Sequence, residues 1–581
     1  MNKPILLPQP RRIDRSAGLA PVATGEPPTV VDPSAVPHAQ GYRLTVGADG
    51  ATITAHDEAG AFYARRTLAQ LVAQADAEGT IPAVVIDDWP DFAHRGVMLD
   101  ISRDKVPTMQ TLLDLVDRLA SWKINEMQLY TEHTFAYAGH EVVWRDASPM
   151  TPDEVRRLDA HCRRRHVELV ANQNSFGHMH RWLRHERYRP LAEAPDGWVG
   201  PGGHRRGPFS LCPIDPRSAE LLADLYDQLL ANFTSRRFNV GCDETWDLGH
   251  GRSKDECRRR GRGRVYLDFL RTIHELVTAR GRTMMFWGDI ILQHPELIGE
   301  LPRDAVALEW GYEADHPFDA HAEKFAQAGL SFYVCPGTSA WNSIVGRTDN
   351  AIANIRSAVE HGLARGAVGC LTTDWGDNGH LQPLPVSYQG YACAAAMSWC
   401  ADANRDLDLP GALDRFAFAD EAGAMGTLAC QLGNVHETMG APRRNQSAIF
   451  TALQQTDRPI AGSVYAELRR DRLDATRDEI GRITAALSRQ RMARDDAALI
   501  VEEYEYAAGL LRLALDAAEA KLASGADDLS ALPERTRRKL AEQLEASLAA
   551  HRSVWLARNR PGGMTDSADK LRRHLGGLGV S

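Results

Sequence analysis

Between residues 95 and 373 the chain alternates short apolar runs with longer amphipathic stretches. The runs are continuously apolar, which is typical of parallel strands buried on both faces. Eight of them are expected to be strands: 96–101, 126–131, 167–171, 238–241, 283–287, 305–310, 331–335 and 367–373. Apolar residues at helical spacing predict helices between most of them: 109–122, 152–165, 218–232, 265–280, 320–328 and 350–365. This order predicts an α/β fold, a (β/α)8 TIM barrel over residues 91–402.

An open, doubly wound sheet is the alternative arrangement of such units. A sheet of that kind commonly carries a glycine-rich phosphate loop after its first strand. Here the first strand ends instead in the sequence DISR, which begins at Asp100. The closed barrel is therefore the preferred prediction.

Two further regions flank the predicted barrel. In residues 1–90, a proline-rich stretch up to Ala39 is expected to be an extended arm of strand and loop rather than part of a folded core. A hairpin around Asp49-Gly50 and a following helix predict a small α+β domain. In residues 403–581, long stretches rich in alanine, leucine and arginine predict a helical domain. That domain would pack against the barrel or against a second copy of the chain in a homodimer.

Composition and charge narrow the functional classes. A net charge of −10 argues against a nucleic-acid partner, because binding to phosphates needs a basic surface. No apolar run approaches the length of a membrane span. Nine scattered cysteines without paired metal-ligand spacing favour reduced thiols over a zinc site. The start MNKPILLPQPRR does not resemble a secretory signal, so a cytoplasmic location is expected.

The stretch FNVGCDETWDLG, residues 238–249, places Asp243 and Glu244 side by side directly after a predicted strand. In a TIM barrel the active site lies at the carboxyl ends of the strands. Four of the twelve tryptophans follow the last four predicted strands: Trp287, Trp310, Trp341 and Trp375. Indole rings match the apolar face of a sugar ring, and carboxylates match its hydroxyl groups, so the set predicts a sugar-binding pocket without a metal or cofactor.

Acids and aromatic residues at a barrel mouth are typical of glycoside hydrolases. Most of these enzymes use two carboxylates about 5–10 Å apart on either side of the scissile bond. Sequence neighbours such as Asp243 and Glu244 fit that geometry poorly. They fit substrate-assisted hydrolysis, in which the 2-acetamido oxygen of the sugar attacks its own anomeric carbon.

Six motifs in order resemble glycoside hydrolase family 20, the β-N-acetylhexosaminidases. They are RGVMLDISRD (from Arg95), FGH (ending at His178), GCDET (containing Asp243 and Glu244), FWGDI, LEW and TDWGD (ending at Asp377). The resemblance covers roughly residues 40–400, including the small domain before the barrel. It implies an exo-acting, retaining enzyme that removes terminal β-linked GlcNAc or GalNAc from an oligosaccharide or glycoconjugate.

The resemblance also implies roles for individual residues. Glu244 would be the general acid/base, and Asp243 would stabilise the acetamido group. Arg95 would bind the 3- and 4-hydroxyls, and Asp377 would accept a hydrogen bond from a ring hydroxyl. The indoles of Trp287, Trp310 and Trp375 would form the walls of the pocket.

The sequence departs from the family pattern at two strand ends. Asn172 and Asn174 stand where the family usually has acidic residues, so His178 is expected to lack a neighbouring carboxylate. After the seventh strand, Trp341 and Ser343 replace the usual tyrosine and aspartate. The indole N–H of Trp341 could still donate to the acetamido carbonyl. These changes keep two alternatives open: a glycosidase or transglycosylase of other specificity, and a non-catalytic sugar-binding barrel.

Overall fold

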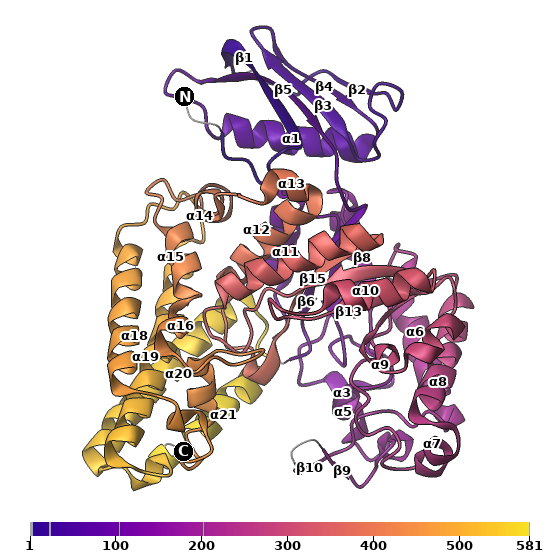
Figure 1. Ribbon diagram of the computed structural model, residues 1–581, viewed down its shortest axis with the longest axis vertical. Helices are drawn as coiled ribbons and strands as arrows, with labels where there is room; N and C mark the ends of the chain where they lie inside the picture. Colours follow the sequence, from indigo (N-terminus) through magenta and orange to yellow (C-terminus); the bar gives the residue numbers. More distant parts are fainter. Residues whose placement is uncertain (1–3, 23–24, 104, 201–202, 580–581) are drawn as a thin grey trace.

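A closed barrel of eight parallel strands forms the centre of the computed structural model, which describes residues 4–22, 25–103, 105–200 and 203–579 (Figure 1). The strands are β6 (His94–Asp100), β7 (Glu126–Tyr130), β8 (Glu168–Asn172), β11 (Arg237–Asn239), β12 (Thr283–Trp287), β13 (Val306–Trp310), β14 (Ser331–Cys335) and β15 (Gly369–Asp374). Each corresponds to one of the eight predicted runs, so the predicted TIM barrel is confirmed. β15 pairs with β6 and thereby closes the barrel.

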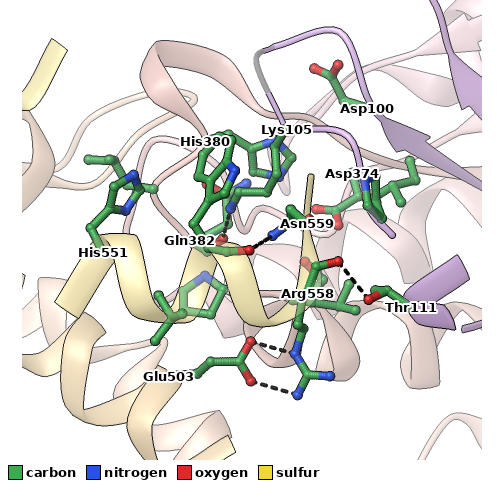
Figure 2. Close-up of a pocket in the computed structure, with 18 of the residues that line it drawn as sticks. Asp100, Lys105, Thr111, Asp374, His380, Gln382, Glu503, His551, Arg558 and Asn559 are labelled. Atoms are coloured by element: carbon green, nitrogen blue, oxygen red, sulfur yellow. Dashed lines mark hydrogen bonds and ion pairs between the residues drawn. The ribbon is translucent and has the colours of Figure 1, made fainter. Parts of the chain in front are cut away.

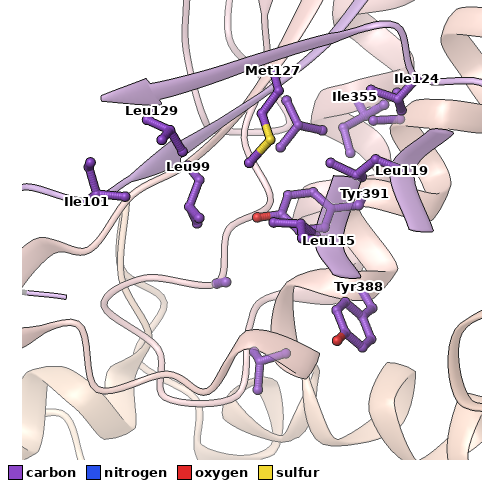
Figure 3. Packing of buried hydrophobic residues seen from close by; sticks show 14 of the residues in the cluster. Leu99, Ile101, Leu115, Leu119, Ile124, Met127, Leu129, Ile355, Tyr388 and Tyr391 are labelled. Atoms are coloured by element: carbon purple, nitrogen blue, oxygen red, sulfur yellow. The ribbon is translucent and has the colours of Figure 1, made fainter. Parts of the chain in front are cut away.

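The helices around the barrel include all six that the sequence predicted. They are α2 (Met109–Ser121), α4 (Pro152–Arg163), α6 (Pro216–Leu230), α8 (Arg262–Thr278), α10 (Phe318–Gln327) and α11 (Thr348–Arg365). The sequence analysis missed α12 (Tyr388–Trp399), in which every residue is buried. A helix covered on all sides has no polar face and therefore no amphipathic pattern. Figure 3 shows Tyr391 of α12 close to Leu115 and Leu119 of α2 in the layer outside the barrel.

The N-terminal region is a five-stranded sheet with one helix. Its elements are β1 (Arg12–Pro21), β2 (Thr29–Val31), β3 (Tyr42–Gly47), β4 (Gly50–Ala55), α1 (Glu58–Val72) and β5 (Thr80–Asp88). The predicted hairpin is confirmed as β3 and β4. The stretch up to Ala39 contains strands, as predicted, but the prediction that it lies outside a folded core was wrong, because β1 pairs with β5 and the side chains of Leu6 and Leu7 are fully buried. Residues 1–3 and 23–24 of that stretch lie outside the described residues.

The C-terminal region is helical, as predicted. Its longest helices are α18 (Arg470–Thr484), α19 (Ala497–Ser524) and α20 (Glu534–Arg558), and they lie along one side of the barrel (Figure 1). Among the described residues, no helix is long and apolar enough to cross a membrane.

A cavity of about 580 Å³ lies between the barrel and these helices (Figure 2). Its charged groups pair with one another: Arg558 Nε donates to Glu503 Oε1 at 2.6 Å, and Lys105 Nζ donates to the Gln382 carbonyl at 2.9 Å. Thr111 Oγ1 of α2 donates to the Arg558 carbonyl at 2.7 Å. Of these three bonds, the one from Thr111 joins the barrel to the helical region, whereas the other two lie within the helical region and within the barrel.

Candidate active site

A pocket of about 460 Å³ opens at the carboxyl ends of the barrel strands. Ten residues line it: Arg103, His178, Asp243, Glu244, Trp287, Trp310, Tyr312, Trp375, Asp377 and Asn445. Seven of the nine residues that the sequence analysis selected are among them. The two that are not are Arg95 and Trp341.

The loop after β11 turns sharply, and this turn directs two acids into the pocket. Gly241, Cys242 and Glu244 have positive φ angles of 69°, 71° and 51°. A Cβ atom on Gly241 would lie 2.6 Å from the Asn174 side chain, so only glycine fits there. A positive φ in Cys242 and Glu244 costs conformational energy, which is commonly found where a functional group must be oriented.

The ring of His178 lies close to three carboxylate side chains. Its Nε2 atom lies 3.3 Å from Asp243 Oδ2 and 3.3 Å from Glu244 Oε2, and its Nδ1 atom lies 3.6 Å from Glu132 Oε1. The expectation that His178 lacks a neighbouring carboxylate was therefore wrong. Burial alone would lower the pKa of His178, but these acids outweigh it and raise the pKa to about 10. At neutral pH the ring is an imidazolium that stabilises the negative charge of Asp243.

Asp243 is buried and remains ionised. Burial favours its neutral form, but the His178 imidazolium and the Asn174 amide lower its pKa below the ordinary value. Asn174 Nδ2 donates to Asp243 Oδ1 at 2.9 Å, so this asparagine supports the acid instead of replacing it. Burial, followed by the charge of Asp243, raises the pKa of Asp289 well above its ordinary value. Of the carboxyl groups of Asp243 and Asp289, that of Asp243 therefore carries the negative charge.

Aromatic rings form the opposite wall of the pocket. The Trp287 and Trp375 rings lie 6.1 Å apart, and the Trp310 ring stacks on Tyr312 at 5.1 Å. Trp375 Nε1 donates to the Tyr312 hydroxyl at 2.8 Å, which fixes that hydroxyl among the three indoles. The sequence analysis did not select Tyr312.

Trp341 supports this wall from behind. It is 1% exposed and packs edge-on against Tyr312. Its indole N–H donates to Asn445 Oδ1 at 3.0 Å, so the proposed donation to a substrate carbonyl is not what the structure shows.

Arg103 and Asp377 form the remaining charged side. Arg103 Nε lies 3.7 Å from Glu132 Oε1 and 3.9 Å from Asp377 Oδ1. Its guanidinium also lies over the ring of Trp375, at 5.0 Å from the ring centroid. Asp100 orients the Arg103 loop by accepting bonds from the backbone N–H groups of Ser102 and Arg103.

Arg95 was assigned to the pocket incorrectly. It is the second residue of β6, so it lies at the amino end of the strand, whereas the pocket lies at the carboxyl ends. Its side chain is fully buried and donates to the carbonyls of Phe92 and Lys123 and to Gln40 Oε1. The guanidinium thus connects the barrel floor to the N-terminal domain. Arg103, eight positions later, supplies the guanidinium in the pocket.

Replacing Arg95 with Met should therefore destabilise the protein. The substitution leaves buried carbonyls without donors, and each buried acceptor left unsatisfied costs about 1–3 kcal/mol. Urea unfolding of the variant should show that loss. The same change at Arg12, an exposed arginine of β1, should cost less than about 0.5 kcal/mol. Equal stability of the two variants would contradict the structural role of Arg95.

Asn445 reaches the pocket from the C-terminal helical region, far from the barrel in sequence. Its backbone N–H donates to Glu313 Oε1 at 2.6 Å, and Glu313 is also paired with Arg347 at 2.9 Å. The helical region therefore completes the pocket of its own chain. No local pattern around Asn445 predicted this contact.

Comparisons with known proteins agree with this architecture. The family model "Glycosyl hydrolase family 20, domain 2" matches residues 5–89, and "Glycosyl hydrolase family 20, catalytic domain" matches residues 92–356. A lacto-N-biosidase of Bifidobacterium bifidum is 24% identical over 285 residues, which are 47% of this chain and 24% of that protein. A β-hexosaminidase of Emericella nidulans is 25% identical over 287 residues, 45% of this chain and 47% of that protein. The chain thus spans about half or less of the length of these two relatives.

The fold extends to the C-terminal helices in one solved structure. The chitobiase of Flavobacterium johnsoniae superposes with a TM-score of 0.59 at 15% identity, over 94% of this chain and 99% of that one. At this identity the likeness concerns the fold alone. The two family models, matched in order to the N-terminal sheet and to the barrel that carries Asp243 and Glu244, show that the chain belongs to glycoside hydrolase family 20.

Proposed function

We propose that the protein is an exo-acting, retaining β-N-acetylhexosaminidase that works by substrate-assisted catalysis. The observation that carries the proposal is that Asp243 and Glu244, adjacent in sequence, both lie 3.3 Å from one nitrogen of His178. Two acids so close together act on the same side of a sugar ring. A nucleophile for the opposite side is then best supplied by the substrate, through its 2-acetamido oxygen. The name of the Emericella relative, a β-hexosaminidase, supports the same substrate class.

Each side chain has a defined part in this reaction. Glu244 donates its proton to the glycosidic oxygen while the acetamido oxygen bonds to C1 and the C1–O bond breaks. Asp243 accepts from the acetamido N–H and stabilises the positive charge of the oxazolinium ion. Water then attacks C1 as Glu244 removes its proton, and the bond between C1 and the acetamido oxygen breaks, which regenerates the acetamido group, restores the acid and retains the configuration.

The shape of the pocket favours a single terminal sugar. Asn445 and the tryptophans enclose one side, and Arg103 and Asp377 offer a donor and an acceptor for ring hydroxyls.

Hydrolysis of aryl glycosides tests the proposal directly. The protein should release the phenol from an aryl β-N-acetylglucosaminide or its galacto epimer, and proton NMR should show the β-anomer of the free sugar first. The aryl β-glucoside, which lacks the acetamido group, should react far more slowly. Equal rates for the glucoside would refute substrate assistance, and sugar binding without turnover would indicate a non-catalytic barrel.

Tyr312 is the best candidate to hold the acetamido carbonyl. Its hydroxyl lines the pocket and accepts from Trp375 Nε1, and a tyrosine hydroxyl can also donate its own proton to a bound carbonyl. Changing Tyr312 to Phe should lower kcat by about 10²-fold, as expected for the loss of one donor to a developing charge. Tyr506→Phe, which removes a buried hydroxyl bonded to His551, should leave kcat unchanged. Full activity of Tyr312→Phe would place the carbonyl elsewhere.

A further inference from the structure

A group of potential metal ligands, separate from the acids of the pocket, lies outside the barrel wall. Glu309 is the penultimate residue of β13, and its neighbours Leu308 and Trp310 belong to the apolar group inside the barrel. Because side chains alternate along a strand, Glu309 points outward, toward α10. There it meets His316, in the connection after β13, and His321, in the first turns of α10.

The three side chains converge on one point. His316 Nε2 and His321 Nδ1 each lie 2.8 Å from Glu309 Oε1. Gly311 permits this approach, because a Cβ atom there would lie 2.1 Å from His316 Nδ1. The ligand atoms of all three residues lie within 4.8 Å of one another.

Glu309 itself indicates that something further binds here. The side chain is 0% exposed, and its Oε2 atom is buried without a hydrogen-bond partner. A buried carboxylate oxygen left without a partner is costly and is usually explained by a bound water or ion. Both imidazoles remain partly exposed, at 18% and 27%, which leaves an approach from solvent.

From this geometry we infer that Glu309, His316 and His321 bind a divalent transition-metal ion of the Zn²⁺ type. Two imidazole nitrogens and one carboxylate oxygen are the ligands that such ions prefer, whereas Ca²⁺ and Mg²⁺ prefer oxygen. Two ligands about 2.1 Å from a metal at the tetrahedral angle of Zn²⁺ are about 3.4 Å apart, so the separations of 2.8 Å seen here would widen by about 0.6 Å on binding. Small side-chain movements would therefore suffice, with Glu309 Oε2 or water completing the coordination.

The site has a structural consequence for the pocket. Trp310 and Tyr312 lie on either side of Gly311, between Glu309 and His316 in sequence. A metal that joins β13 to α10 would hold this segment, and with it the aromatic wall, in place. The inference concerns metal binding and holds whether or not the proposed hydrolase activity is found.

The full chain, purified without a histidine tag, provides the test. Elemental analysis after equilibration with Zn²⁺ and dialysis should find one equivalent per chain, and Co²⁺ should give visible absorption bands of a bound ion. His316→Gln and His321→Asn are the informative variants. Their amide N–H groups can still donate to Glu309, but they remove the nitrogen that a metal needs. Each should lose the bound equivalent and the cobalt spectrum, with circular dichroism confirming that it is folded.

Two matched variants locate the ion. His361→Gln changes a more exposed histidine, 3.7 Å from Asp319, and should retain one equivalent. His178→Gln disrupts the other group of potential ligands, His178, Asp243 and Glu244, and should also retain it. Absence of bound metal in the unaltered protein would overturn the inference and leave Glu309 as a hydrogen-bonded carboxylate. Loss of the ion only in His178→Gln would overturn it as well, by placing the metal in the catalytic pocket.

Discussion

Glu244→Gln should lower kcat/KM for an N-acetylglucosaminyl disaccharide by about 10³–10⁴-fold, the contribution of a well-placed general acid. A sugar alkoxide leaves only when it is protonated, and the amide of Gln cannot supply that proton. A dinitrophenolate leaves without protonation, so the same variant should lose far less kcat/KM on a dinitrophenyl glycoside. A series of aryl glycosides should therefore show a much steeper dependence on leaving-group pKa in the variant than in the unaltered protein.

The contrast between substrates separates this role from a loss of folding or binding. Glu275→Gln, a change of an exposed glutamate on α8, should be silent with every substrate. A uniform loss across all leaving groups in Glu244→Gln would mean that Glu244 positions the sugar and that another group is the acid. Because Glu244 also faces His178, an NMR titration should show a lowered His178 pKa in the variant.

The barrel could be predicted from sequence because its strands are buried on both faces. Runs such as 283–287 are continuously apolar and are bounded by amphipathic helices, so element type and order follow from local pattern. The fully buried α12 lacks that signal, and β1 lies in a proline-rich stretch that resembles a loop. Both become ordered through contacts with partners distant in sequence.

The acids and tryptophans were found by one rule, that chemistry lies at the carboxyl ends of the strands. Applied consistently, the rule would also have rejected Arg95 and selected Arg103. Arg95 begins its strand and Arg103 follows it, and the error came from transferring a role to the first arginine of the motif. The same rule would also have selected Tyr312, since it follows β13 by two residues.

Other features of the site depend on tertiary geometry alone. His178 follows β8 and the two acids follow β11, so their contact required the strand pairing. Asn445 comes from a loop about seventy residues beyond the last barrel strand. The contacts with His178 and Asn174 that keep Asp243 ionised likewise cannot be read from composition.

Asp243→Asn should lower kcat by about 10²–10³-fold, and by a similar factor for every leaving group. Asn is nearly isosteric with Asp, so the pocket should keep its shape while the charge is lost. The oxazolinium ion forms in every reaction regardless of the aglycone, and its positive charge would then face a neutral amide. The measurement is kcat of Asp243→Asn on the same series of aryl glycosides. Asn174→Asp, a variant that retains an acid in this part of the pocket, is measured beside it.

The Asp243→Asn variant also has a readout that does not depend on turnover. Asp243 is the strongest of the influences that raise the pKa of His178 to about 10, opposing the burial that lowers it. Without that carboxylate, NMR should find the His178 pKa well below 10, so that the imidazolium loses its proton much closer to neutral pH. Burial and the charge of Asp243 together raise the pKa of Asp289, so that pKa should fall in the same variant.

If both pKa values shift while kcat is unchanged, the charge is arranged as described but does not stabilise the transition state. A loss of kcat confined to poor leaving groups would instead make Asp243 the proton donor, because only that role depends on the aglycone.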